Sequence, residues 1–322
     1  MQKTDLKTKN ILSDEKKSKA QKYQELIIGK TGWGSLIKYE LIMLICSTLP
    51  GVLGLFLRSK LYPMLLGSCG KGVVFGSNVV LRHPHKIHVG DDVVIDDNCL
   101  LDAKGVSNSG IKLGNGVFIG RNSILSCKDG DIVLEESVNM GFNCEIFSAS
   151  EVVVGRKTMI AAYCYLIAGN YDTTAGIPFG DQDGFGSGVG VHIGEYAWLA
   201  ADVKVLDEVT VGEHTVVGAG AVLGLGVHRI AAGATVAVVV LLEVARRLVE
   251  AVAGENVVQE VGPVKQVRDR HVLVRWRLLR LQVDLEVEEE RFAAVGAVAG
   301  DVHLGAVLVG MDVVAARDGV LR

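Results

Sequence analysis

The side chains best suited to acid–base or metal chemistry in this 322-residue chain are three histidines that lie within six residues. They are His83, His85 and His88, and the first two flank Pro84. Histidine titrates near neutral pH, so the cluster predicts either a general base or a set of metal ligands. A tetrahedral zinc site needs convergent ligands, and no closely spaced histidine pair follows later in the chain. We therefore expect no metal, and His85 is a candidate catalytic residue that projects into a groove.

The acids and cysteines of the same region have structural explanations. Aspartates at positions 91, 92, 96, 97 and 102 predict turns, because short acidic side chains hydrogen-bond to nearby backbone. The six cysteines form no CxxC pair. We predict that Cys99, Cys144 and Cys164 are small buried apolar residues in a reducing compartment.

These side chains need a scaffold, and residues 73–222 supply one through a six-residue repeat. Aliphatic residues recur every six positions at Ile193, Leu199, Val205, Val211 and Val217. The residue four positions after each of them is small or β-branched. A period of six fits neither a 3.6-residue helix nor a plain alternating strand. It predicts a short strand followed by a turn, with three such sides closing one triangular coil.

Insertions into this repeat indicate where function lies. Successive coils start at positions 89, 113, 134, 154, 193 and 211, so the excess over three hexads is 6, 3, 2, 21 and 0 in turn. Solenoids carry insertions as outward loops, often on the binding face. The longest excess predicts a functional loop at 169–190. The first coil, around Phe75 and Leu81, is irregular and has no predicted register.

The aliphatic-Gly-x-x-small-x units of residues 73–222 resemble the hexapeptide-repeat acyltransferases. Residues 192–206 are similar to the I-G-x-x-x-W-I-G-x-x-x-x-I-L block of the galactoside, maltose and xenobiotic O-acetyltransferase branch, and residues 217–222 resemble its closing block. The resemblance implies an all-β fold, a left-handed parallel β-helix that forms a homotrimer. It also implies transfer of an acetyl group from acetyl-CoA to a hydroxyl or amine of a sugar in a surface polysaccharide or glycolipid.

The same resemblance assigns cofactor-binding residues. In that family CoA lies along the groove between neighbouring subunits. The backbone at Trp198, Ala200, Gly218 and Ala219 is therefore expected to face the pantetheine arm. Ala200 replaces the usual glycine, which keeps the N–H group and adds one methyl group.

The long loop departs from the family pattern. The catalytic histidine of the branch sits early in this loop, but the loop here contains no histidine, and residues 168–172 read AGNYD. Asp172 could act as the base if burial raised its pKa, whereas Tyr171, with a reference pKa near 10, is a poor base at neutral pH. Asn170, Tyr171 and Gln182 are the expected substrate-binding residues. The alternative function is a catalytically silent trimeric scaffold.

The N-terminal part of the chain, up to residue 72, predicts a membrane-associated segment. Residues 1–40 are polar and rich in lysine, which is typical of a surface helical segment. Residues 41–57 carry no charge, but Pro50 interrupts them, and they fall short of the about 20 apolar residues of a spanning helix. The segment 41–72 fits a helix–break–helix in one leaflet, at the cytoplasmic face of the membrane, with lysines at anionic headgroups. The alternative is an apolar helical hairpin packed on the next domain.

The last third of the chain has a different composition. Before residue 225 there are 17 Lys and 4 Arg, and after it there are 1 Lys and 11 Arg. The segment 225–322 contains no Ser, Cys or Tyr. Two interpretations of residues 223–322 stay open: a segment translated out of frame, or a genuine Val-rich domain of strands. No convincing hexad frame follows Val222.

The overall charge limits the classes of partner. The chain has 33 basic and 37 acidic residues and a net charge of −4, which argues against a whole-chain polycation. Nucleic acid is therefore not an expected partner. With 39 Gly and only 5 Pro, the composition excludes Pro-rich disorder and favours a fold built on tight turns.

Overall fold

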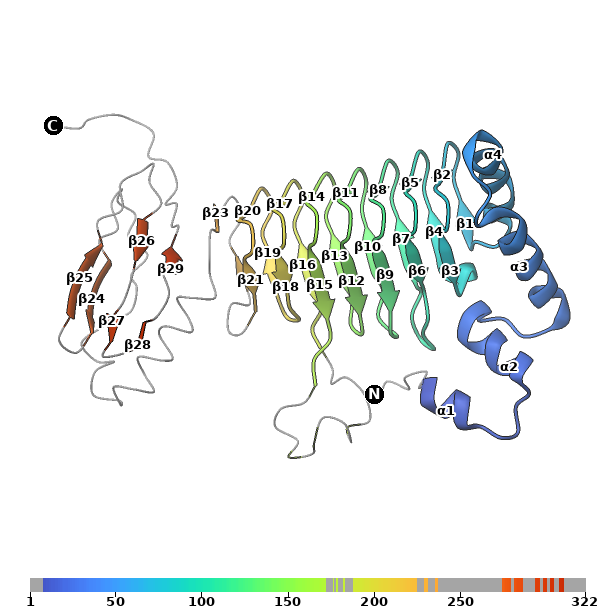
Figure 1. The fold of residues 1–322 in the computed structure, drawn as a ribbon, viewed down its shortest axis with the longest axis horizontal. Coiled ribbons are helices and arrows are strands. Elements are labelled where there is room, and N and C mark those ends of the chain that lie inside the picture. The colour runs from blue at the N-terminus through green and yellow to red at the C-terminus, as the bar shows by residue number, and fades with distance from the viewer. Residues whose placement is uncertain are drawn as a thin grey trace.

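The computed structural model describes residues 8–171, 176, 178, 182, 188–224, 229–230 and 235–236, together with short strands between 274 and 309. Over residues 68–236 the chain winds into a parallel β-solenoid, in which successive coils add strands to the same three sheets (Figure 1). The predicted fold class, a parallel β-helix preceded by a helical segment, is confirmed.

Three sheets, here named A, B and C, form the sides of the solenoid in the described part of the chain. Sheet A contains β1 Ser68–Cys69, β4 Ile87–Val89, β7 Ile111–Leu113, β10 Ile132–Leu134, β13 Val152–Val154, β16 Val191–Ile193, β19 Thr210–Val211 and β22 Arg229–Ile230. Sheet B contains β2 Val74–Phe75, β5 Val94–Ile95, β8 Phe118–Ile119, β11 Asn139–Met140, β14 Met159–Ile160, β17 Trp198–Leu199, β20 Val216–Val217 and β23 Thr235–Val236. Sheet C contains β3 Val80–Arg82, β6 Leu100–Asp102, β9 Ile124–Cys127, β12 Glu145–Ser148, β15 Tyr165–Ala168, β18 Lys204–Val205 and β21 Val222–Leu223.

Neighbouring coils pair in register, so equivalent side chains stack along the axis of the solenoid. In sheet C, Leu101 pairs with Leu125, and Ile146 pairs with Leu166. All four side chains are buried, and together with Leu81 they form one apolar column. Alternate side chains of a strand point to the same face, and in these coils the inward-facing ones are buried. The six-residue period in the sequence is the spacing of these inward side chains.

Two of the three corners are tight turns of constant length. In the described coils, four residues link sheet A to sheet B, and four residues link sheet B to sheet C. The third turn residue has a positive φ, and asparagine often fills it, as at Asn78, Asn98, Asn122 and Asn143. Asparagine tolerates this left-handed region better than most residues. Its N–H bonds the preceding coil, as from Asn98 N to Ser77 O at 2.8 Å, so each turn is fixed to its neighbour.

The third corner, between sheet C and the next strand of sheet A, varies in length. Counted in residues, its links have lengths of 4, 8, 4, 3, 22, 4 and 5 in successive coils. The insertions that the sequence predicts therefore all emerge from one edge of the solenoid, the lower edge in Figure 1. We call this edge the insertion edge.

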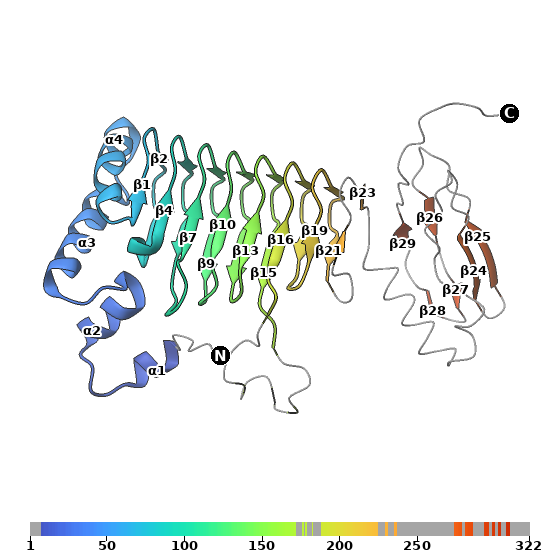
Figure 2. The same ribbon diagram turned by 180° about the vertical axis from the view of Figure 1, so that it is seen from behind.

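Helices cover the N-terminal end of the solenoid (Figures 1 and 2). They are α1 Thr8–Ser13, α2 Lys19–Tyr23, the π-helix η1 Gln24–Ile28, α3 Trp33–Cys46, α4 Gly51–Leu61 and the 3-10 turn η2 Tyr62–Met64. A further 3-10 turn, η3 Pro84–Lys86, lies in the first coil. Pro50 is the N-cap of α4, which confirms the predicted break in the apolar run. The predicted boundary at residue 40 falls inside α3.

Polar side chains fasten α3 and α4 to the first coil. The Tyr39 hydroxyl of α3 donates to Leu81 O at 2.8 Å. Arg58 of α4 is buried and donates to Phe75 O at 2.9 Å, Cys46 O at 3.0 Å and Leu49 O at 2.7 Å. One face of this helical pair thus packs on the solenoid. No helix among the described residues is long and apolar enough to cross a membrane.

The solenoid extends past residues 73–222 at both ends. It begins at Ser68, and pairing with the next coil gives the irregular first coil a clear register at Phe75. At the other end β22 and β23 continue sheets A and B. Ile230 and Val236 pair at the positions of the apolar columns and lie six residues apart. The hexad frame therefore persists beyond Val222, where the sequence showed none.

The described strands of the C-terminal segment form antiparallel pairs. β24 Val274–Leu278 pairs with β25 Leu281–Leu285, β26 Ala293–Val295 with β29 Val307–Val309, and β27 Val298–Ala299 with β28 Val302–His303. The other residues of the predicted tail 223–322 beyond 236 lie outside the described residues. The out-of-frame interpretation stays a prediction.

Candidate functional site

The long loop leaves the insertion edge after β15 and returns at β16. Most of it, including the candidate base Asp172, lies outside the described residues. The described part shows Asn170 and Tyr171 exposed at the start of the loop, where Tyr171 N donates to Asn170 Oδ1 at 2.9 Å. Gln182 is half-buried. The structure thus brings Asn170 and Tyr171 together at the loop entrance, and their predicted role in substrate binding stays a prediction.

The returning end of the loop is held by an aspartate from the next coil. Asp207 is only 9% exposed, and its Oδ1 accepts a hydrogen bond from Gly190 N at 2.9 Å. Ser150 Oγ donates to Gly188 O at 3.1 Å from the other side. Gly190 has φ of +108°, and a Cβ there would lie 2.5 Å from Glu151 O, so only glycine fits this return.

Asp207 is also a buried acid beside the loop, and only one of its two carboxylate oxygens accepts a hydrogen bond among the described residues. Its Oδ2 is buried and has no hydrogen-bond partner in the described part of the chain. A buried carboxylate oxygen without a partner is costly, and such groups occur preferentially at functional sites. Sequence reasoning missed Asp207 because it resembles the other turn acids. Its position in the coil directly after the long insertion is the one signal that could have marked it.

The predicted cofactor-facing residues lie on sheet B and at the corner that follows it. Trp198 is half-exposed and is flanked in register by Met159 and Val216. These side chains form an apolar surface on the outside of sheet B. Ala219 is exposed in the turn of the next coil. The structure thus brings Trp198, Ala200, Gly218 and Ala219 onto neighbouring coils.

The backbone amides of this surface are committed to the sheet. Ala200 N donates to Val217 O at 2.9 Å, and Trp198 N donates to Thr215 O at 2.8 Å. The N–H group that Ala200 retains therefore binds the next coil and leaves no donor for a thioester oxygen. What this surface offers a ligand is the Trp198 ring and the small side chains beside it.

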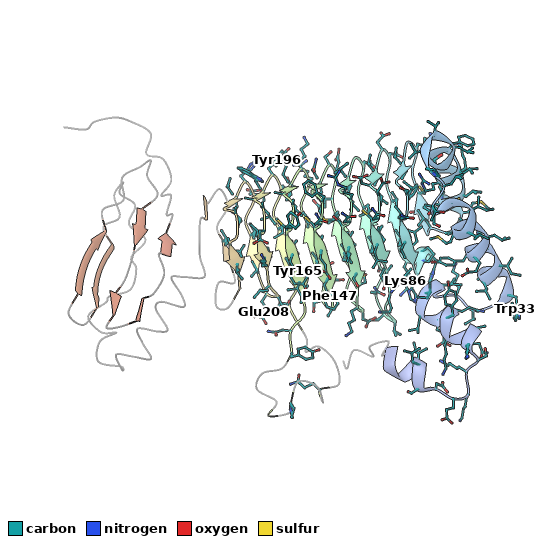
Figure 3. All side chains as sticks on the ribbon, in the orientation of Figure 1. Trp33, Lys86, Phe147, Tyr165, Tyr196 and Glu208 are labelled. Atoms are coloured by element: carbon teal, nitrogen blue, oxygen red, sulfur yellow. The ribbon has the colours of Figure 1, made fainter. Side chains whose placement is uncertain are left out.

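The loop and the sheet B surface are separated within one chain. Trp198 and Ala200 belong to sheet B and its corner, whereas the loop follows sheet C at the insertion edge. One whole side of the triangular coil lies between them. Figure 3 shows side chains of sheet C, among them Phe147 and Tyr165, along that intervening side.

His85 lies far from both groups. It is in η3 of the first coil, four strand spacings of sheet C before the long loop, or about 19 Å. Its ring meets the N-terminal segment near Gly29, where a Cβ would lie 2.7 Å from His85 Cε1. Burial, with the nearby charges of Lys30 and Lys86, lowers the pKa of His85 to about 4. The imidazole is neutral at pH 7 and is a weak base.

Three further histidines of the described chain have structural contacts or face solvent. His83 is buried, and its Nε2 lies 3.0 Å from Glu25 O. His88 is exposed, with Nδ1 3.0 Å from Ser68 Oγ. His214 stacks on Tyr196 at a turn, with ring centroids 5.0 Å apart. In the part of the chain that the structure describes, no group of three His, Cys, Asp or Glu side chains is arranged to hold a metal ion.

The prediction that three of the cysteines are small buried residues is confirmed. Cys99, Cys144 and Cys164 are free, buried and directed inward at equivalent positions of their coils. Their thiols donate to carbonyls of the following coil, at 3.3, 3.0 and 3.2 Å respectively. Burial raises the pKa of Cys99 to about 11, which keeps that thiol protonated.

A second, shorter insertion at residues 103–110 lies on the same edge. Lys86 Nζ donates to Gly105 O at 2.9 Å and to Asn108 Oδ1 at 2.8 Å. Asp129 accepts from Val106 N at 2.6 Å and from Ser107 N at 2.7 Å. Burial alone would raise the pKa of Asp129, but these hydrogen bonds outweigh it and hold the pKa below its usual value. The insertion edge therefore carries a second loop, fixed by hydrogen bonds, three strand spacings from the long one.

Comparison with solved structures finds distant likeness to acyltransferases. Galactoside acetyltransferase in complex with coenzyme A is 15% identical with a TM-score of 0.35, over 62% of this chain and 74% of that one. The N-acyltransferase AntD from Bacillus cereus, in complex with dTDP and coenzyme A, is 16% identical with a TM-score of 0.39, over 64% and 100% of the two chains.

Curated relatives match part of the chain. The acetyltransferase WcaF of Escherichia coli, named for colanic acid biosynthesis, is 31% identical over 110 residues, which cover 34% of this chain and 57% of that protein. The bifunctional protein GlmU of Francisella philomiragia is 25% identical over 186 residues, which cover 47% and 40%. The chain thus spans about half the length of these relatives. The family of bacterial transferase hexapeptide (six repeats) matches residues 190–224. Residues 190–224 of this chain are therefore similar to the hexapeptide repeat of bacterial transferases.

Proposed function

We propose that this protein is an acyltransferase that moves an acetyl group from acetyl-CoA to a hydroxyl or amine of a sugar in a surface polysaccharide or glycolipid. The observation that carries the proposal is the segment 190–224. It matches a transferase repeat, forms continuous parallel coils, and directly follows the long link 169–190 of the insertion edge. The similarity to WcaF, which is named as an acetyltransferase of colanic acid biosynthesis, supports the transfer of an acetyl group.

The proposed reaction needs a base and an anchored donor. The base removes a proton from the acceptor hydroxyl or amine, and the acceptor oxygen or nitrogen attacks the thioester carbonyl. The C–S bond then breaks, and the leaving CoA thiolate takes up the proton from the base. The Trp198 surface is suited to pack against the pantetheine arm. Because the amides of Trp198 and Ala200 are bonded within the sheet, the donor for the developing oxyanion comes from another group.

A homotrimer would complete the site. Within one chain, sheet C separates the Trp198 surface from the long loop. A neighbouring copy could place its own loop beside this surface, so that the donor and the acceptor meet between subunits. We therefore include a trimer in the proposal, and sedimentation velocity on the full chain tests it.

The activity is tested by release of free thiol from acetyl-CoA in the presence of a series of sugar acceptors. Wild-type protein should release thiol with at least one acceptor. Trp198→Ala should weaken CoA binding, measured by calorimetry, about tenfold or more through loss of apolar contact. Trp33→Ala is the matched control, since Trp33 is also exposed but lies on α3.

The second candidate function is a catalytically silent trimeric scaffold. The observation that favours it is the absence of a histidine from the long loop. CoA binding without thiol release for any acceptor would support the scaffold and overturn the enzyme. Thiol release would overturn the scaffold, and Asp172→Asn, Asp207→Asn and His85→Gln would then identify the base from their separate losses of kcat.

A further inference from the structure

Helices α3 and α4 leave a large set of apolar side chains in contact with solvent. These side chains are at least 40% exposed, and Leu44 and Val52 reach 78% and 83%. We call this set the apolar face: Trp33, Ile37, Leu41, Leu44 and Ile45 of α3, Val52, Leu53, Leu55 and Phe56 of α4, and Met64. Isolated exposed apolar residues are ordinary, but a contiguous patch of this kind marks an interaction site.

The apolar face points away from the solenoid. The opposite sides of the two helices are the ones bound to the first coil, through Tyr39 to Leu81 and through Arg58 to Phe75. The helices form the end of the folded body, and Trp33 projects outward from that end (Figure 3). No described element of the chain covers the exposed stripe.

Charge is excluded from the middle of this face and is positive at its margin. Residues 41–57 contain no charged side chain. Arg58, the nearest cation, is turned inward onto three carbonyls. Lys38 and Lys60 are exposed at the margin, where Lys38 Nζ also donates to Met64 O at 2.6 Å. The exposed carboxylate of Glu40 lies beside Lys38 in the chain and accepts a hydrogen bond from the Tyr23 hydroxyl at 2.6 Å. An apolar centre with exposed lysines around it complements the surface of a bilayer that carries anionic lipid.

The helices are suited to lie in the interface and not to span it. α3 has 14 residues, about 21 Å, against a hydrocarbon core of about 30 Å. The link Ser47–Pro50 ends the helical run before α4, and Arg58 of α4 donates back to Cys46 O at the end of α3. Both helices must therefore enter and leave on the same side of a bilayer. This geometry buries one side of each helix and keeps the other on the protein.

We infer that the apolar face seats on an anionic phospholipid bilayer and that the solenoid stands away from it. This inference does not depend on the proposed enzymatic activity. Lipid is favoured over a protein partner because the face has a charge-free centre, a cationic margin and an indole at its edge. Tryptophan is enriched at membrane–water interfaces.

The test is co-sedimentation of the full chain with vesicles of phosphatidylcholine alone or of phosphatidylcholine and phosphatidylglycerol in a two-to-one mixture. Wild-type protein should bind the anionic vesicles, and Leu44→Glu with Phe56→Glu should weaken binding at least tenfold. The matched control is Val106→Glu with Val189→Glu, which adds the same charge at exposed valines on the insertion edge and should leave binding within twofold. Circular dichroism checks that each variant is folded.

A second pair of variants separates the two components of binding. Lys38→Gln with Lys60→Gln should lower affinity for the anionic vesicles about 25-fold, because each lysine contributes roughly a fivefold effect. The same pair should change binding to phosphatidylcholine vesicles little. Failure of folded wild-type protein to bind anionic vesicles at low salt would overturn the inference. Equal losses of vesicle binding in the apolar-face pair and the control pair would also overturn it. The same holds if the wild-type protein is an oligomer that dissociates when Leu44 and Phe56 are replaced while vesicle binding is unchanged.

Discussion

The strongest single tether of the helical end is the buried side chain of Arg58, and its removal makes a quantitative prediction. Arg58→Met keeps the apolar stem but removes the donors to Phe75 O, Cys46 O and Leu49 O. A buried carbonyl left without a donor costs about 1–3 kcal/mol. Removal of a buried guanidinium also relieves its desolvation, so we take the lower figure for each carbonyl. The expected cost is about 3 kcal/mol, or roughly a 100-fold rise in local opening of α4.

Hydrogen exchange followed by mass spectrometry measures this opening segment by segment. Peptides that cover 41–62 should exchange about 100-fold faster in Arg58→Met, while peptides from the central coils keep their wild-type rates, because solenoid units contact only their neighbours. Arg121→Met is the matched control, since Arg121 is exposed and contacts the Phe142 ring. A rise below threefold in 41–62, or an equal rise in 132–154, would show that Arg58 does not tether the helices locally.

Three further predictions concern other parts of the solenoid. Gly190→Ala should lower the free energy of unfolding in urea by about 2 kcal/mol or more, because the residue has a positive φ and its new Cβ would clash with Glu151 O. The control Gly176→Ala also has a positive φ but open space around it, so it should cost about 1 kcal/mol or less. Equal costs at both glycines would refute the close return of the loop. Burial raises the pKa of Cys127 to about 12. At pH 8 this thiol should therefore react with iodoacetamide about 1,000-fold more slowly in folded than in unfolded protein, as measured by mass spectrometry. Comparable rates would show that the site opens freely. Asp129→Asn should cost about 1–3 kcal/mol at pH 7. Because the pKa of Asp129 is lowered, its stabilisation is present above about pH 4 and is lost as the pH falls through the folded-state pKa, so the cost of the substitution should shrink in acid.

Much of the solenoid was predictable because its core side chains report the fold directly. The hexad residues from Val89 to Val217 are the inward columns of the three sheets, and each pairs at the position that the period requires. The first coil escaped because Cys69 stands before Gly70 at the position where the second coil has Val89 before Gly90. Its register comes from pairing with the second coil and from contacts with α4, which are not local in sequence.

The functional site was less predictable for a different physical reason. The length of the long insertion was readable, but the group that holds its end, Asp207, has the same sequence appearance as the solvent-facing turn acids. The sequence also does not show which backbone amides are free, since Ala200 N donates a hydrogen bond to Val217 O in the next coil. His85 looked suitable from its type alone, whereas its burial against residues near Gly29 depends on how the N-terminal segment folds back.

The restriction of length changes to the insertion edge has a consequence for how the molecule can be altered. At the other two corners one added residue would shift the strand pairing of every later coil. At the insertion edge, links as different in length as 149–151 and 169–190 are followed by strands that pair in the same register. Complete coils can therefore be removed as units. Deletion of residues 135–154 would join Leu134 to the residue after its own register partner, Val154. It would shorten the solenoid by one strand spacing, about 4.8 Å, and would bring the long loop that much closer to the helical end. The number of coils thus sets the distance between the helical end and the long loop.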